Sequence, residues 1–221
     1  MKRILFALIV AVILLPSCAT PRYFGGFKTS DAIGDMALLG PASCQFFVDY
    51  NNNEHYSDSL SAVSQAMLTD ITLQMVPINE VMPLDSLQKE EAVAFMRFIF
   101  DQPKAVMENA AIPSALDDML ETAGIRYGLL IYADGMTRDK KAYLRDSAIG
   151  LALGIATAIL TLGMVSVYGY SIPYVSGMDA AVLDSQTDRV VYYSHFPADE
   201  RNPLSEKQVR TQLARVLRDF R

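Results

Sequence analysis

The sequence predicts an α/β protein of the α+β kind: a small mixed or antiparallel sheet packed by helices, with an apolar insert, expected to be helical, between two strands. Four short apolar runs rich in β-branched and aromatic residues are typical of strands and span residues 44–50, 127–133, 178–184 and 189–196. Between and after them, apolar residues recur at a spacing of 3.6, which indicates helices. The chain has 221 residues, and about 200 remain after a short leader, enough for one domain with its own core.

The leader is an export signal. Lys2 and Arg3 precede an apolar run over residues 4–15, which ends in Leu15-Pro16-Ser17-Cys18. A basic start, a short apolar core and a small residue before the cut mark a secretory signal that is too short for a comfortable membrane span. The last four residues resemble a bacterial lipobox, in which the signal peptidase cuts before the cysteine. We therefore expect a signal peptide over residues 1–17 and an acylated Cys18, where each buried methylene contributes ~0.8 kcal/mol to anchoring.

The residues after Cys18 predict where the protein is anchored. Lipoproteins similar to this one stay at the inner membrane when aspartate follows the cysteine, but here Ala19 follows. Residues 19–23 also lack the acidic run with which some phyla send lipoproteins to the cell exterior. These features imply the periplasmic side of the outer membrane. Prolines and glycines up to Pro41 indicate a tether over residues 18–42, followed by a single α/β domain over residues 43–221.

The first half of the domain is predicted to be one strand and then helices. After the strand at 44–50, a helix begins at Ser57, and its expected buried face consists of Leu60, Val63, Met67, Ile71 and Met75. Residues 78–82 form a short extended piece between two prolines. Asp85 and Gln88 resemble a capping box that opens a helix to Asp101, whose apolar second half, residues 92–100, should be deeply packed.

The second half is predicted to hold a helix, three pairing strands and a terminal helix. A helix over residues 113–123 has proline at an early position and Gly124 placed to stop it. The strand at 127–133 should pair with a hairpin whose arms are 178–184 and 189–196. The terminal helix opens with a capping box of Ser205 and Gln208. Its expected buried residues are Val209, Leu213, Val216, Leu217 and Phe220.

An uncharged insert, residues 148–174, interrupts this second half. Residues 148–167 are almost wholly apolar, and about twenty such residues in a helix match the thickness of a bilayer core. Small residues recur four apart, which lets helices approach closely in lipid: Gly150, Gly154 and Ala158. Bulky residues hold the odd positions, as in a membrane-inserting β-hairpin: Ile149, Leu151, Leu153, Ile155 and Ile159. The many alanines and leucines favour the helix.

Two environments remain open for this insert. It could be a buried central helix of the core, or it could contact the bilayer. Basic residues before it and tyrosines after it resemble interfacial anchors: Arg138, Lys140, Lys141, Arg145, Tyr168, Tyr170 and Tyr174. Because the lipid anchor already holds the chain at a membrane, we expect bilayer contact.

Residue types that carry chemistry are sparse. His55 and His195 are the two histidines, and neither lies at a metal-ligand spacing. Once Cys18 is acylated, Cys44 is the one remaining thiol, and we interpret it as a buried strand residue. A catalytic dyad of Cys44 with His195 would need a thiolate, which an apolar strand disfavours. Asp134-Gly135 and Asp184-Ser185 at strand ends are interpreted as turns.

These observations predict a protein that is not an enzyme and has no cofactor and no metal. Four residues around the asparagine turn could hold a cation, although a polar loop that caps a helix explains them as well: Asp49, Glu54, His55 and Asp58. No phosphate loop, dinucleotide fingerprint or G-x-S-x-G elbow is present. The formal charge of −6 falls to about −8 without the leader, and an acidic surface argues against nucleic acid as a partner.

Two segments carry a family resemblance. The strand 127–131 and the run 181–192, with a strand ending in aspartate, a turn and a strand with an aromatic residue, resemble periplasmic lipoproteins of the curli-secretion-channel type and the amino-terminal domain of TolB. This chain departs from those families by lacking the usual glycine after Thr187 and by its long insert. In the secretion-channel proteins an insert at a comparable place forms membrane hairpins of an oligomeric pore, so the resemblance implies a possible homo-oligomer.

Two functions follow as hypotheses. The first is a non-enzymatic component of the envelope that assembles with itself or with a protein partner in export or envelope organisation. The second is a periplasmic ligand-binding lipoprotein with a pocket lined by Phe95, Phe98 and the tyrosines. The membrane lipid is a partner in both, through Cys18 and the insert.

The lipobox predicts that Cys18→Ala leaves an uncut, unacylated precursor, because this cysteine is both the cleavage point and the anchor. Metabolic labelling with a fatty acid analogue measures this directly. Equal labelling of the variant and the parent would show that Cys18 is not the anchor.

Overall fold

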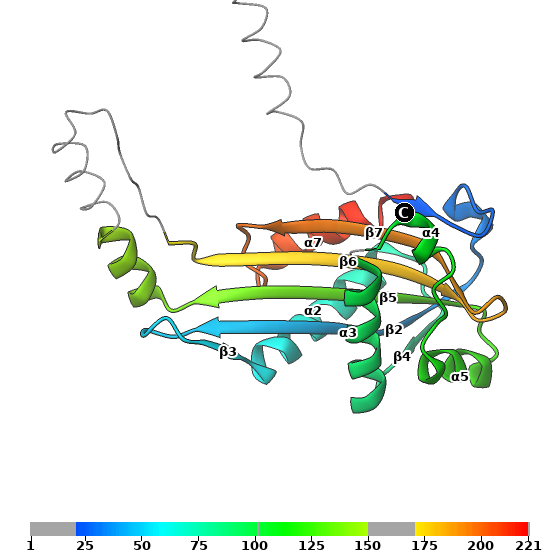
Figure 1. Cartoon of the computed structure of the whole chain (residues 1–221), viewed down its shortest axis with the longest axis horizontal. Helices are drawn as coiled ribbons and strands as arrows, with labels where there is room; N and C mark the ends of the chain where they lie inside the picture. The colour runs from blue at the N-terminus through cyan, green and yellow to red at the C-terminus, as the bar shows by residue number, and fades with distance from the viewer. Residues whose placement is uncertain (1–20, 101, 150–170, 221) are drawn as a thin grey trace, which may run out of the picture.

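The structure is a computed structural model that describes residues 21–100, 102–149 and 171–220, and it confirms the α/β class with a mixed sheet and helices on both of its faces (Figure 1). The strands are β1 (Arg22–Tyr23), β2 (Met36–Val48), β3 (Glu54–Tyr56), β4 (Glu80–Met82), β5 (Tyr127–Arg138), β6 (Tyr174–Asp184) and β7 (Arg189–Asp199). The helices are α2 (Asp58–Met75), α3 (Ser86–Phe100), α4 (Lys104–Met107), α5 (Ser114–Ala123) and α7 (Glu206–Val216), with 3₁₀ turns η1 (Ser30–Ala32) and η2 (Arg218–Phe220).

The strand order is β1-β7-β6-β5-β2-β3, and β4 also pairs with β2, at the opposite end of that strand from β3. β2 runs parallel to β4 and to β5, whereas the other neighbours are antiparallel. The predicted pairing of the hairpin β6–β7 with β5 is therefore confirmed. β5 and β6 lie in the middle of the sheet.

The central strands are apolar on both sides because both sides are covered, as in sheets flanked by two helix layers. Leu129, Ile131 and Ala133 of β5 pack with α2 and α7 in one apolar cluster. Leu130 and Tyr132 point to the other side and pack with α3, α4 and α5. This explains why these strands form nearly continuous apolar runs in the sequence instead of alternating with polar residues.

Most helix ends follow from local sequence. Ser57 caps α2 by accepting a hydrogen bond from the backbone N–H of Leu60. Asp85 and Gln88 form the predicted capping box, with reciprocal bonds of 2.9 and 2.8 Å. Gly124 ends α5 in the left-handed region, with φ of 69°, where L side chains are disfavoured.

The capping box predicted for the terminal helix is wrong. The side chain of Ser205 makes no capping bond, and the Gln208 side chain instead accepts from the backbone N–H of Asn202 in the preceding turn. The predicted buried face of this segment is confirmed, although its last member, Phe220, lies in η2 after the helix.

The predicted tether over residues 18–42 is also wrong from residue 22 onward. Arg22 and Tyr23 pair with β7 as strand β1, Phe24 is buried, and β2 begins at Met36. The prolines and glycines were misleading because Gly40 and Pro41 lie inside β2, at a break in its register with β5. Three residues, 19–21, separate Cys18 from β1.

Two predicted helix faces need correction. In α2 the side chains turned to the sheet include Ser61 and Ser64, while Val63 is exposed. The serines are buried because they lie against the polar Gln45 of β2: Ser61 accepts from its backbone N–H. In α3 the second half is not packed all round, since Phe98 and Phe100 are about half exposed.

The predicted membrane insert lies largely outside the described residues. Ile149 is the last described residue of a helical stretch that begins at residue 140, and it is 51% exposed. The other residues predicted to contact the membrane, 150–159, fall in the undescribed range 150–170, as Cys18 does in 1–20. The predicted end of the insert at residue 174 is wrong by one residue, because Tyr174 begins β6. Within the part of the chain that the structure describes, no helix is long and apolar enough to cross a membrane.

The terminal segment predicts a strong contrast between two neighbouring side chains. Phe220 is buried and packs edge-on against Tyr192, with ring centroids 4.8 Å apart, whereas Arg218 is exposed. Phe220→Ala should cost roughly 3–5 kcal/mol of unfolding free energy, and Arg218→Ala a few tenths. Thermal or urea unfolding of both variants measures the difference, and equal stabilities would contradict this packing.

Candidate functional site

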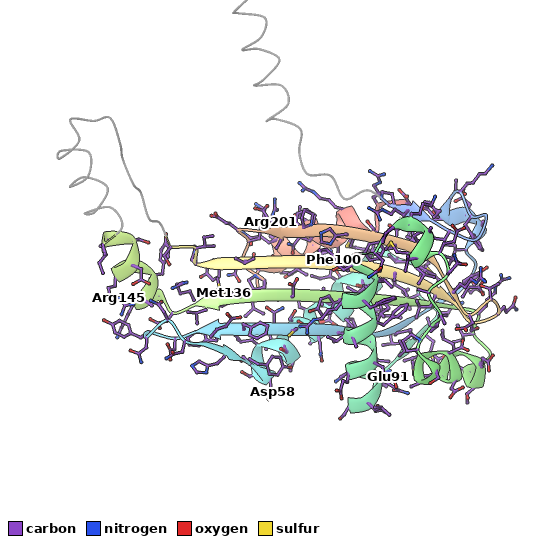
Figure 2. All side chains as sticks on the ribbon, in the orientation of Figure 1. Asp58, Glu91, Phe100, Met136, Arg145 and Arg201 are labelled. Carbon is purple, nitrogen blue, oxygen red and sulfur yellow. The ribbon has the colours of Figure 1, made fainter. Side chains whose placement is uncertain are left out.

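An open cleft of about 550 Å³ lies on the face of the sheet that carries α3. In Figure 1, α3 crosses this face, and β2, β5 and β6 continue past it toward the helical stretch 140–149. Figure 2 labels Phe100 at the end of α3 over β6, and Met136 on the part of β5 beyond the helix. The strands form the floor of the cleft and α3 forms one wall.

The lining combines apolar side chains with a few charged groups. Apolar lining residues from the strands are Phe46, Met136, Val175 and Pro197, and those from α3 are Met96 and Phe100. The titratable lining groups are Glu54, Arg97, Tyr132, Asp134, Asp179 and His195. Such a mixture of an apolar surface and a few convergent polar groups is typical of binding pockets.

Asp179 of β6 is buried and has two partners at one carboxylate oxygen. Its Oδ1 accepts a 2.5 Å hydrogen bond from the Tyr193 hydroxyl and lies 2.8 Å from Nδ1 of His195. Asp179 and His195 are cross-strand partners in register, so the β6–β7 pairing itself positions them. The His195 ring also packs edge-on against Phe100, with centroids 4.6 Å apart, which links the floor of the cleft to its wall.

Asp134 of β5 is held in a different way. Its side chain lies over Gly177 of β6, where an added Cβ would come within 2.6 Å of the Oδ1 atom. Glycine is therefore needed at position 177 to make room for the carboxylate. The surrounding protein atoms raise the pKa of Asp134 by desolvation, and repulsion from Asp179 raises it further, although the cleft leaves the group open to solvent.

Arg97 of α3 donates to one other lining residue, Tyr132, and to Cys44 outside the cleft. Its Nε donates to the Tyr132 hydroxyl at 3.3 Å, and its Nη2 donates to Sγ of Cys44 at 3.5 Å. Burial raises the pKa of Tyr132 and of the Cys44 thiol, and Arg97 opposes both shifts. Cys44 lies on a strand, as predicted, but it is half-buried instead of buried, and its thiol is disfavoured as a thiolate.

The dyad of Cys44 and His195 does not form. Cys44 lies on β2 and His195 on β7, with β5 and β6 between them. Three inter-strand spacings amount to about 14 Å, too far for proton transfer between the two side chains. The cleft thus holds an oriented histidine without a nearby thiol.

The acidic loop at residues 49–58 is a structural turn. Asp49 accepts hydrogen bonds from the backbone N–H groups of Asn51 and Asn53 and lies 3.2 Å from the His55 ring. The bonds from Asn53 and its neighbours lower the pKa of Asp49 to about 2. Among the residues that the structure describes, no three His, Cys, Asp or Glu side chains are arranged to hold a metal ion.

Asp184 is also structural, and sequence analysis recognised only part of its role. Its Oδ1 accepts from the backbone N–H of Gln186, as expected of a turn. In addition, the fully buried carboxylate receives two 2.9 Å bonds from Arg126, whose guanidinium lies over the Tyr127 ring. This bidentate pair joins the start of β5 to the end of β6.

Asp134 and Asp179 are site residues that were not predicted from the sequence. Asp134 was interpreted as a turn because the predicted strand ended at Ala133, but β5 continues to Arg138. The signal was present in the alternation of Tyr132, Asp134 and Met136 on one side of the strand. The predicted pocket is also corrected: Phe100 lines the cleft, whereas Phe95 is buried in the core and Phe98 is exposed outside it.

Comparisons with known proteins reveal distant structural likeness. No family model and no curated protein matches the chain. Similar solved structures include a point variant of the PelC dodecamer from Paraburkholderia phytofirmans, 12% identical over 91% of this chain and 98% of that chain, with a TM-score of 0.41. The LpoB C-terminal domain from Salmonella enterica is 8% identical over 80% of this chain and 88% of that one, with a TM-score of 0.30. A DUF4136 family protein from Bacteroides thetaiotaomicron is 9% identical over 89% and 93%, with a TM-score of 0.27. At these identities and TM-scores the likenesses assign no function to the chain.

The raised pKa of Asp134 predicts a pH-dependent loss of stability. Above the ordinary carboxyl pKa of about 4 the unfolded chain releases this proton more readily than the folded chain. Stability should therefore fall as the pH rises from there through the folded-state pKa. Asp134→Asn stays neutral, so its melting temperature relative to the parent should rise between pH 4 and pH 7.

Asp70→Asn is the matched control, because it removes one carboxylate from the exposed surface of α2. Melting curves at several pH values are compared for the two variants and the parent. For each variant, the melting temperature relative to the parent is followed as the pH rises. If this difference grows no more for Asp134→Asn than for Asp70→Asn, the Asp134 carboxylate is not desolvated in the folded protein.

Proposed function

We propose that this chain is a non-enzymatic lipoprotein of the bacterial envelope, anchored through Cys18 at the periplasmic side of the outer membrane, whose domain binds a ligand in the sheet cleft. The observation that carries the proposal is the cleft itself. It is concave, it is lined by aromatic and aliphatic side chains, and it carries charged groups both on its floor, at Asp134, Asp179 and His195, and on its wall, at Arg97.

The dimensions of the cleft support a small ligand. Its volume of about 550 Å³ falls within the range of small-molecule sites in proteins, ~300–1,000 Å³. The floor consists of paired strands, and side chains on such a rigid scaffold hold their positions better than side chains on loops. The ring contact between Phe100 and His195 further fixes the wall against the floor.

A role in binding instead of catalysis is supported by what surrounds His195. Asp179 and Tyr193 orient this histidine, but the thiol of Cys44 lies on a strand three positions away in the sheet. A histidine and carboxylate with no cysteine beside them as a nucleophile suit the binding of a ligand better than covalent catalysis.

The short link to the anchor supports action close to the membrane. If Cys18 carries acyl chains, the three residues before Arg22 allow at most about 14 Å between the lipidated residue and strand β1. The β1–β7 edge of the sheet would then lie near the lipid surface. A ligand delivered from or to the membrane would meet the domain within a short distance.

A second candidate is the assembly or accessory role in export or envelope organisation. It is favoured by exposed apolar side chains at the end of the sheet where β2 and β5 finish. Tyr50, Leu144 and Ile149 are each about half exposed there, and Arg145 of the helical stretch 140–149 stacks over the Tyr50 ring at 4.5 Å (Figure 2). Exposed apolar groups of this kind suit a protein partner or a second copy of the chain.

Native mass measurement of the mature protein in mild detergent tests the proposal. A monomer with a co-purified small mass is expected. Phe100→Ala should lose that mass because Phe100 forms the wall of the cleft, and Phe98→Ala should keep it. The two phenylalanines are matched, since they lie on the same helix with exposed fractions of 44% and 50%.

A ring or another large oligomer without a bound small molecule would instead favour the assembly role. Retention of the small mass by Phe100→Ala would place the ligand outside the cleft and contradict the proposal.

A further inference from the structure

We infer that the ligand of the cleft carries a protonated amine on an apolar, preferably aromatic body, and that the carboxylate of Asp134 is its counter-ion. This inference rests on the proposed ligand-binding function and adds the chemical class of the ligand. It follows from the state of three charged side chains on the cleft walls and floor, together with the rings around them.

Asp134 is a carboxylate of the cleft floor that receives no hydrogen bond from another side chain of the described residues; its donor is its own backbone N–H. Asp179 already has two partners, the Tyr193 hydroxyl and the His195 ring. Neighbouring protein atoms of the cleft floor partly desolvate the Asp134 carboxylate, while the cleft leaves its other side open to solvent. A partly desolvated carboxylate without a side-chain donor gains more from an incoming cation than a hydrated carboxylate on the surface would.

The charges of Arg97 and His195 attract the Asp134 carboxylate and lower its pKa, but neither side chain donates a hydrogen bond to it. Two of the Arg97 donors point to Tyr132 and Cys44. The lining therefore contains three carboxylates, those of Glu54, Asp134 and Asp179. Its basic side chains are Arg97 and His195, and His195 is bonded to Asp179. This balance favours a cationic ligand over an anionic one.

The rings define the rest of the ligand. Phe46, Phe100 and Tyr132 line the same cleft as Asp134. Aromatic faces attract cations through their quadrupole and bury apolar bodies at the same time. A carboxylate among aromatic rings thus matches an amine attached to an apolar group.

Three small probes with one body test the inference: benzylamine, benzyl alcohol and benzoate, which at pH 7 are cationic, neutral and anionic. Binding to the mature lipoprotein in mild detergent is measured by titration calorimetry and ligand-observed NMR. The parent should bind benzylamine about tenfold or more tightly than benzyl alcohol, the ratio expected of one charge-assisted hydrogen bond. Asp134→Asn should remove that preference, and the control Asp70→Asn should retain it, with circular dichroism showing that both are folded.

Three results would overturn the inference. Equal binding of amine and alcohol by the parent would show that the charge of Asp134 is not used; if Phe100→Ala then weakens both, the cleft still binds ligands and only the amine class is wrong. Preference for benzoate that is lost in Arg97→Gln would assign an anionic ligand. Binding of none of the probes would reject this class of ligand, while the co-purified mass still decides whether the cleft binds a ligand at all.

Discussion

The structure depends on the burial of the central strands β5 and β6 by helices. These strands are longer than the width of the helix that crosses them. β5 has 12 residues and is therefore about 40 Å long, whereas a helix with its side chains is about 10 Å wide. A helix that crosses the strands, as α3 does, covers only part of their length (Figure 1). The cleft is the remainder of that face, so it results from the architecture of the sheet and not from a loop.

On both faces of the sheet, the buried side chains change from apolar to polar at the same position along the strands. On the α2 and α7 side, the apolar core gives way to buried polar groups: Gln45 bonds Ser43 and approaches Ser64, and Gln212 bonds Ser176. On the other side, Asp134 and Asp179 appear on the same stretch of β5 and β6. Since buried polar groups must be paired or hydrated, this belt separates the core of the domain from the part of the sheet that is free to bind.

Much of the fold could be predicted from the sequence because its signals are local. The apolar runs of β5, β6 and β7, the box of Asp85 with Gln88 and the stop at Gly124 each depend on residues close together in the chain. The misses depend on distant partners. β2 extends back to Met36 because β4 and β5 pair with it, and Ser61 is buried because Gln45 of another element meets it.

The candidate site was harder to predict for the same reason. A carboxylate that follows an apolar run, as Asp134 does, is ordinarily a turn residue, and the sequence contains no trace of Gly177 as its neighbour across the sheet. Asp179 inside an apolar strand was the better signal, because a charged residue at a buried position needs a partner. Its partners, Tyr193 and His195, become visible only once the register of β6 with β7 is known.

The parallel pairing of β2 with β5 also constrains the order in which the chain can fold. Met36 meets Tyr127, so the two halves of the sheet are joined by a contact about 90 residues apart in sequence, and contacts of this kind form slowly. Until β5 is available, β2 has its hairpin with β3 and its short neighbour β4, but its long apolar edge is open. During synthesis, which begins at the N-terminus, this edge of β2 would stay unpaired while about 80 further residues are added. Unpaired strand edges associate with other chains. The yield of folded protein would then be limited by association of the open β2 edge with other chains, more than by the stability of the complete sheet.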